Sequence, residues 1–153
     1  MICEASNFNT IPLRLSIRRY VYRLVRNMKL LLLVCAGGAI GAGLRYALNM
    51  LALHTLSLQL HWATFTINIL GSLIMGAVTA YILLKLPDAI GLRVFVATGI
   101  LGGFTTFSAF SLDTLLLLER GNISLALAYI IGSVTLSILA CILGYFGVRA
   151  LIL

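Results

Sequence analysis

Four long apolar stretches constrain the fold of this chain more than any other feature. They cover residues 30–53, 62–84, 93–118 and 123–148. Each is long enough to cross the hydrocarbon core of a bilayer, which requires roughly 20 residues of helix. Within lipid, only helices and closed barrels satisfy every backbone polar group. The pattern therefore predicts an all-α integral membrane protein with four transmembrane helices and both termini on the same side.

The composition excludes a water-soluble enzyme. Charged residues make up 10% of the chain and apolar residues 61%, whereas a soluble domain carries about 25% charged residues. The three cysteines, Cys3, Cys35 and Cys141, have no metal-ligand spacing and predict neither a zinc site nor a disulfide framework. The sequence also shows no nucleotide-binding loop and no nucleophile–base pair. We therefore expect no enzymatic activity.

Basic residues are concentrated at the N-terminus. The net charge is +7, and five of the eleven basic residues precede Met28, namely Arg14, Arg18, Arg19, Arg23 and Arg26. Such a cluster favours anionic lipid headgroups and a cytoplasmic location, so we expect a lipid bilayer and no nucleic acid as partner. Met28 would serve equally well as a translation start. We predict a basic N-terminal extension over residues 1–28 and a transmembrane domain over residues 29–150.

The orientation of the chain depends on that extension. Without it, four basic residues lie on the terminal side and two on the other, namely Lys29, Lys85, Arg93 and Arg149 against Arg45 and Arg120. This weak bias permits insertion in both orientations, and hence an antiparallel dimer. With the extension the ratio becomes nine to two, which favours termini inside. The sequence leaves both topologies open.

The third apolar stretch contains two adjacent glycines, Gly102 and Gly103, followed by two threonines, Thr105 and Thr106. Each glycine weakens a helix by roughly 1 kcal/mol relative to alanine, so we expect a break in mid-membrane. Carbonyls freed by a break must be buried in protein or bind a ligand such as a small cation. The alternative is a kinked helix whose threonines bond back to their own carbonyls.

Polar side chains recur at helical spacing on two other stretches. Thr64 and Asn68 share a face of the second, and Tyr129, Ser133 and Ser137 share a face of the fourth. A stripe of hydroxyl and amide groups can replace water around a permeating ion. The alternative is hydrogen bonding between helices, worth about 0.6 kcal/mol on average in a membrane bundle.

Phe107 and Phe110 are three residues apart and share a helix face. Phenylalanines at this spacing usually pack in a core, but the edges of their rings carry positive potential and can face an anion.

Arg45 is expected either to reach the membrane interface or to form a vestibule that attracts anions. We expect Asp113 to pair locally or reach the interface, and His61 to lie solvated in a loop.

Together these motifs resemble the CrcB/Fluc family of fluoride ion channels. The resemblance covers residues 29–150. It is carried by three motifs: Gly37-Gly38 through Gly41-Ala42 to Arg45-Tyr46, Asn68-x-x-Gly71 with Gly76, and Gly102-Gly103-Phe104-Thr105-Thr106-Phe107-Ser108-x-Phe110-Ser111. It implies a fluoride-selective channel for passive efflux, lowering cytoplasmic fluoride and its toxicity. It also implies an antiparallel dual-topology homodimer in the cell inner membrane.

The resemblance also implies roles for individual residues. A structural sodium ion (Na+) at the dimer centre would be held by the main-chain carbonyls of Gly102 and Thr105. Arg45 would lie in the vestibule. The implied pore-lining residues are Thr64, Asn68, Phe107, Phe110, Tyr129, Ser133 and Ser137. The chain departs from the family at Ala109, where threonine is usual, and at Asp113, where glutamate is usual.

Two other classes compete with this interpretation. Small four-helix multidrug transporters bind cationic drugs through a carboxylate in the first helix, but residues 30–84 contain no Asp or Glu. A non-transporting membrane scaffold needs no aligned polar stripe, yet the sequence leaves it open.

Overall fold

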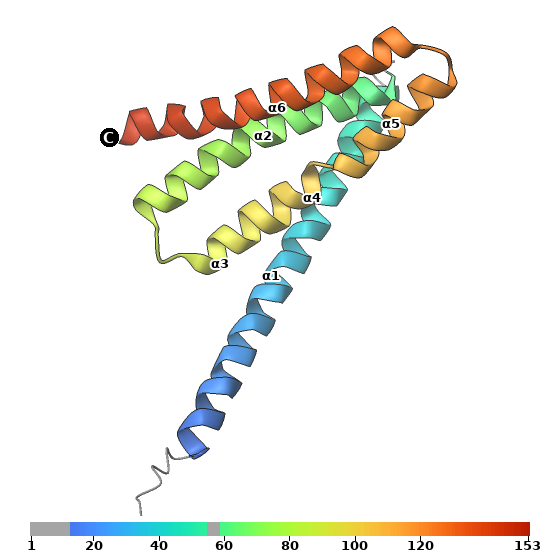
Figure 1. Ribbon diagram of the computed structural model, residues 1–153. Coiled ribbons are helices and arrows are strands. Elements are labelled where there is room, and N and C mark those ends of the chain that lie inside the picture. Colours follow the sequence, from blue (N-terminus) through green and yellow to red (C-terminus); the bar gives the residue numbers. More distant parts are fainter. Residues whose placement is uncertain (1–12, 55–58) are drawn as a thin grey trace, which may run out of the picture.

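The computed structural model describes residues 13–54 and 59–153, and the regular structure within them is entirely helical (Figure 1). Helix α1 spans Leu13–His54, α2 spans Leu60–Lys85 and α6 spans Ile123–Ile152. Between α2 and α6 lies a composite third helix, Ile90–Glu119. Four helical segments are long and apolar enough to cross a membrane, which confirms the predicted spans and a multi-pass membrane protein.

The composite third helix is interrupted, as the sequence predicts. It consists of α3 (Ile90–Arg93), the π-helical segment η1 (Val94–Leu101), the single turn α4 (Gly102–Phe104) and α5 (Phe107–Glu119). The helix breaks at Thr105 and Thr106, whose backbone is extended, with φ/ψ of −81°/155° and −152°/123°. Extended backbone suits β-branched residues such as threonine.

The break lies just after the glycine pair, and the reason is packing. Gly103 lies against α1, and a Cβ on Gly103 would stand 2.6 Å from the carbonyl oxygen of Gly38. Likewise, a Cβ on Gly37 would stand 2.5 Å from the carbonyl oxygen of Phe95. The glycines therefore allow α1 and the third helix to approach closely, and the chain changes direction at the two threonines.

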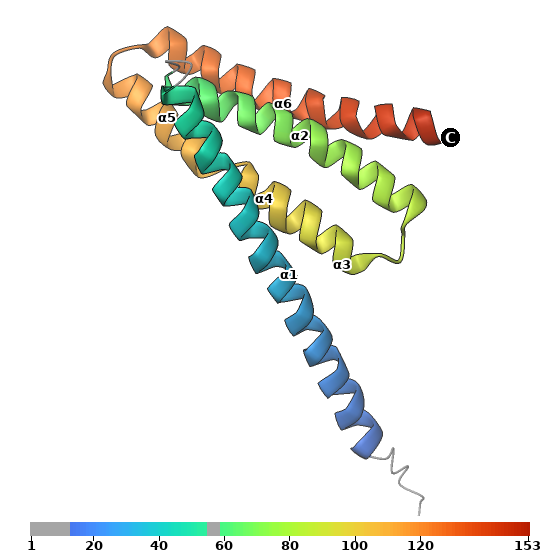
Figure 2. The ribbon, with the colours of Figure 1, turned by 180° about the vertical axis from the view of Figure 1, so that it is seen from behind.

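The other close helix pair is α2 with α6, which run side by side (Figures 1 and 2). Gly76 of α2 packs on the carbonyl of Cys141, and Gly144 of α6 packs on the carbonyl of Leu73. In each case an added Cβ would collide with the neighbouring backbone. Close backbone contacts at small residues of this kind are typical of membrane helices.

The structure corrects the prediction for His61. Helix α2 begins at Leu60, so His61 lies in its first turn rather than in a loop. Its side chain is 5% exposed and meets the ring of Tyr129 edge-on, with centroids 5.8 Å apart. The expectation of a solvated histidine is therefore wrong, because aromatic packing buries the imidazole between α2 and α6.

Candidate ion-binding groove

Asn68 of α2 forms two hydrogen bonds to the backbone at the break in the third helix. The Asn68 Nδ2 donates a hydrogen bond to the carbonyl of Thr106 at 3.1 Å, and its Oδ1 accepts one from the Thr106 N–H at 2.8 Å. One side-chain amide thus satisfies both backbone polar groups of an extended residue. Within a membrane, backbone polar groups at a helix break need such partners from the protein.

Further hydrogen bonds secure the two ends of the break. The Thr106 hydroxyl accepts from the N–H of Ala109 at 3.3 Å and so caps α5. The Thr105 hydroxyl donates back to the carbonyl of Leu101 at 3.0 Å. From α1, the Arg45 Nε donates to the carbonyl of Gly103 at 3.3 Å. The guanidinium therefore binds the broken helix from its α1 side.

The four carbonyls from Gly102 to Thr105 lose their helical donors at the break, and Arg45 donates to that of Gly103 instead. In an unbroken helix the carbonyls of Gly102 and Thr105 would accept from the N–H groups of Thr106 and Ala109. Those N–H groups instead donate to Asn68 Oδ1 and to the Thr106 hydroxyl. Across residues 13–54 and 59–153, no hydrogen bond reaches either carbonyl from outside its own helical turn. Both oxygens are thus available to a ligand.

An open groove of about 280 Å³ lies along the break, between α2, α5 and α6. Five of the predicted pore residues come together in it: Asn68, Phe107, Phe110, Ser133 and Ser137. The phenyl rings of Phe107 and Phe110 lie 5.3 Å apart at 45°. The full lining consists of Asn68, Ser72, Thr105, Thr106, Phe107, Phe110, Ser133, Val134, Ser137 and Ile138. No charged side chain is among these lining residues of the described chain.

The other two predicted pore residues lie outside this lining. Tyr129 is 1% exposed and stacks behind Phe110, with ring centroids 5.4 Å apart. Its hydroxyl donates to the Asp113 Oδ2 at 3.3 Å, which gives the buried carboxylate the local partner that the sequence suggested. Thr64 is also buried, and its hydroxyl donates to the carbonyl of Leu60 at 3.3 Å. Thr64 and Tyr129 thus belong to the packing around the groove.

Ser72 lines the groove although sequence reasoning did not select it. It lies one turn beyond Asn68, so it continues the stripe of Thr64 and Asn68. That spacing could have identified it. Ser133 also lines the groove and is 5% exposed, and it lies one turn beyond Tyr129 on α6. Its hydroxyl therefore belongs to the polar wall that α6 contributes to the groove.

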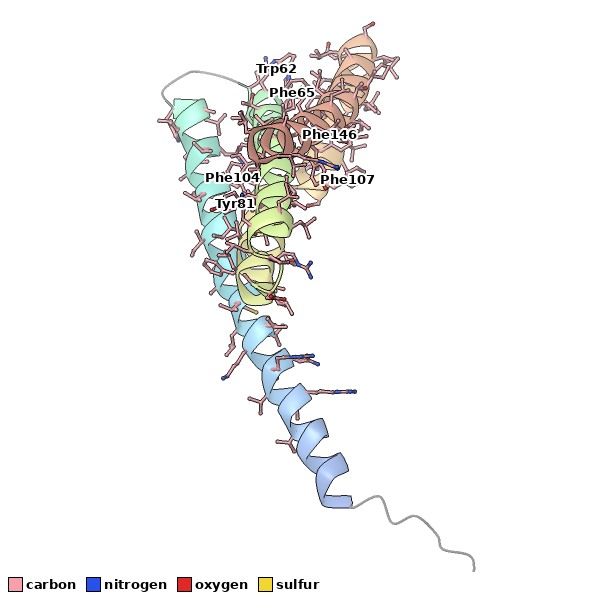
Figure 3. All side chains as sticks on the ribbon, turned by 90° about the vertical axis from the view of Figure 1, so that its left-hand side faces the viewer. Trp62, Phe65, Tyr81, Phe104, Phe107 and Phe146 are labelled. Atoms are coloured by element: carbon pink, nitrogen blue, oxygen red, sulfur yellow. The ribbon has the colours of Figure 1, made fainter. Side chains whose placement is uncertain are left out.

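The exposure of Phe107 sets it apart from the rest of the groove. Its side chain is 75% exposed, while Phe110 is 8% exposed. Figure 3 shows Phe107 and Phe104 on opposite sides of the helices, although only two residues separate them. The break therefore turns the chain so that one aromatic side chain faces α1 and α2 and the next projects outward beside the groove.

Comparison with known proteins decides the family. The sequence matches the family described as CrcB-like protein, Camphor Resistance (CrcB), over residues 32–145. This chain belongs to the CrcB family. The matched region includes every residue that lines the groove and lies inside the predicted domain of residues 29–150.

Several curated relatives align with this chain over nearly their whole length. The chain is 48% identical over 120 residues to "Fluoride-specific ion channel FluC 2" of Nitrobacter hamburgensis, covering 78% of this chain and 97% of the relative. It is 44% identical over 125 residues to "Fluoride-specific ion channel FluC" of Rhizobium meliloti, covering 82% and 100%. It is 50% identical over 121 residues to the protein of the same name from Mesorhizobium japonicum, covering 79% and 97%.

Proposed function

We propose that this chain forms a fluoride-selective channel through which cytoplasmic fluoride leaves the cell passively, across the inner membrane. The observation that carries the proposal is the groove beside the helix break, where Phe107 and Phe110 lie with the amide of Asn68 and the hydroxyls of Ser133 and Ser137. The relatives named as fluoride-specific ion channels support the same conclusion.

The groove suits a small anion that must be held without being trapped. Ring edges and neutral N–H and O–H donors stabilise an anion less strongly than an arginine or lysine would, which permits release. The Asn68 amide uses one of its two N–H donors on the Thr106 carbonyl, and the second remains for an ion. The hydroxyls of Ser133 and Ser137 line the α6 side of the groove and would supply further O–H donors.

Passive transport is sufficient for the task. Hydrogen fluoride is a weak acid that crosses membranes in its neutral form and dissociates at cytoplasmic pH, which traps the anion. A membrane potential contributes about 2.3 kcal/mol per charge per 100 mV and drives an anion outward. A channel of this kind lowers cytoplasmic fluoride and its toxicity without an energy-coupling site.

We expect the functional unit to be an antiparallel, dual-topology homodimer. A single copy leaves the groove open along one side, and Phe107 is 75% exposed there. An ion path open to hydrocarbon would leave polar groups without partners, which lipid does not tolerate. A second copy packed on this face would close the groove, and the inverted arrangement follows the implication of the CrcB/Fluc resemblance.

A structural sodium ion at the centre of the dimer would account for the unpaired carbonyls of Gly102 and Thr105. Carbonyl oxygens at helix breaks are typical sodium ligands in membrane transporters. Among residues 13–54 and 59–153, no three His, Cys, Asp or Glu side chains gather to form a metal site. A cation at the break would therefore rely on main-chain oxygens, and two copies would supply four of them. The ion would hold the broken third helices of the two copies together.

The experiment that tests the pore assignment is fluoride efflux from liposomes that contain the full chain, with a fluoride electrode and a potassium ionophore. We expect Phe107→Ile to slow efflux by at least about tenfold, equivalent to losing roughly 1.4 kcal/mol of ion stabilisation. The matched control is Phe146→Ile, because Phe146 is also exposed but lies on α6 outside the groove. Equal rates in both variants, with dimers intact, would refute the assignment.

A further inference from the structure

The N-terminal half of α1 stands apart from the rest of the molecule (Figures 1 and 2). Helix α1 has 42 residues, which gives a length of about 63 Å at 1.5 Å per residue. That is about twice the roughly 30 Å of a hydrocarbon core. Because residues 30–53 alone are long enough to cross the core, the part of α1 before them is not needed for the crossing.

This part of α1 carries an apolar stripe. Val21, Leu24, Val25 and Met28 follow the spacing i, i+3, i+4, i+7 and therefore share one face of the helix. Their side chains are 49%, 50%, 48% and 52% exposed. A stripe of four exposed apolar side chains over two turns, before the residues needed to cross the hydrocarbon core, calls for a partner surface.

The opposite face is basic. At 100° per residue, Arg23 and Arg26 lie about 200° and 140° around the helix from Val21. Both are exposed, and Lys29 follows at the edge of the same face. Helix α1 contains no Asp or Glu to neutralise them. Figure 3 shows nitrogen-tipped side chains projecting from this part of α1, clear of the other helices.

We propose that residues 21–29 form a membrane-surface helix that binds anionic lipid headgroups where α1 enters the bilayer. The apolar stripe would lie at the boundary between headgroups and acyl chains, and the arginines would contact lipid phosphates. Helices with one apolar and one strongly basic face bind membranes in this way, and each surface arginine adds attraction to an anionic leaflet.

The arrangement of α1 favours lipid over other partners. Figures 1 and 2 show that α1 runs obliquely to α2 and α6. A helix that is tilted from the bilayer normal has one side facing the headgroups where it leaves the bilayer. The segment is also continuous with the first membrane span, and headgroups are the nearest anionic surface. Nucleic acid would match the arginines but would leave the apolar stripe uncovered.

The test uses environment-sensitive labels on the full chain with Cys3, Cys35 and Cys141 replaced by alanine. A nitrobenzoxadiazole label is placed on Leu24→Cys in the apolar stripe or on Asn27→Cys outside it. The protein is reconstituted into phosphatidylcholine, with or without an equal part of phosphatidylglycerol. We expect a lipid-borne nitroxide to quench the Leu24→Cys label strongly in anionic vesicles and weakly in neutral ones. Aqueous iodide should quench the Asn27→Cys label in both.

Two results would overturn the proposal. Equal iodide quenching of both labels in both kinds of vesicle would place the segment in water. Protection of the Leu24→Cys label from both quenchers would show that protein, such as a second copy, covers the stripe. Neither result depends on fluoride transport, so failure of this inference is distinct from failure of the proposed function.

A charge-matched pair of variants tests the role of the arginines. In the Leu24→Cys background, Arg23→Gln with Arg26→Gln should abolish the extra lipid quenching in anionic vesicles. Lys85→Gln with Arg149→Gln removes the same charge at the ends of other helices and should leave it unchanged. An equal loss in both double variants would show that net charge, and not this helix face, governs the binding.

Discussion

Replacing Asn68 with alanine removes both hydrogen bonds that hold the extended backbone at Thr106. The Thr106 N–H and carbonyl, now bonded at 2.8 Å and 3.1 Å, would be left without side-chain partners. A fully buried polar group without a partner costs about 1–3 kcal/mol. Because these two bonds are only part-buried, we expect a loss of about 1–3 kcal/mol in total in the free energy of unfolding. Because Asn68 also lines the groove, the same substitution should abolish fluoride efflux.

The stability of this variant can be measured by denaturant unfolding in mixed detergent micelles. Trp62 is the single tryptophan and lies edge-on to Phe65 at 5.6 Å, so its fluorescence reports on the packing of α2. The control is Thr66→Ala, whose exposed hydroxyl donates only to the carbonyl of Trp62 in its own helix. We expect that change to stay within about 0.5 kcal/mol. If Asn68→Ala behaved like this control and still conducted fluoride, the reasoning about the break would be refuted.

Two further predictions concern helix packing and the cation. Gly76→Ala places a methyl group against the carbonyl of Cys141 and should lower the free energy of unfolding by about 1–3 kcal/mol. Gly147→Ala is the control, because Gly147 has open space around it and the free energy of unfolding should not fall. Equal stability of the two variants in micelles would contradict the contact. If sodium binds the carbonyls of Gly102 and Thr105, replacing Na+ with N-methylglucamine should weaken the dimer in cross-linking experiments, and an unchanged dimer fraction would argue against that site.

The spans and the break could be predicted from the sequence because both depend on local properties. Apolar length determines whether a helix can cross a bilayer, and the run from Gly102 to Thr106 combines poor helix formers with β-branched residues. The exact site of the break could not be predicted. It depends on Gly103 lying against Gly38 of another helix, a contact that no local pattern encodes.

The groove was predictable only in part, for a related reason. Spacing places Asn68, Ser133 and Ser137 on helix faces but does not say which turn of each face meets the break. The structure leaves Thr64 and Tyr129 in the surrounding packing and brings Ser72 to the groove instead. The bond from Arg45 to the Gly103 carbonyl joins residues 58 positions apart. It arises because the break exposes a carbonyl to α1, which a single-helix pattern cannot reveal.

The ion selectivity of the full chain in liposomes tests the proposed channel function most directly. Vesicles loaded with potassium fluoride or potassium chloride are diluted into low-potassium buffer, valinomycin is added, and the release of each anion is followed with an ion-selective electrode. A fluoride-selective channel should release fluoride rapidly without added nucleotide and release little chloride. Absence of fluoride release from correctly folded protein, or equal release of both anions, would contradict a fluoride-selective channel.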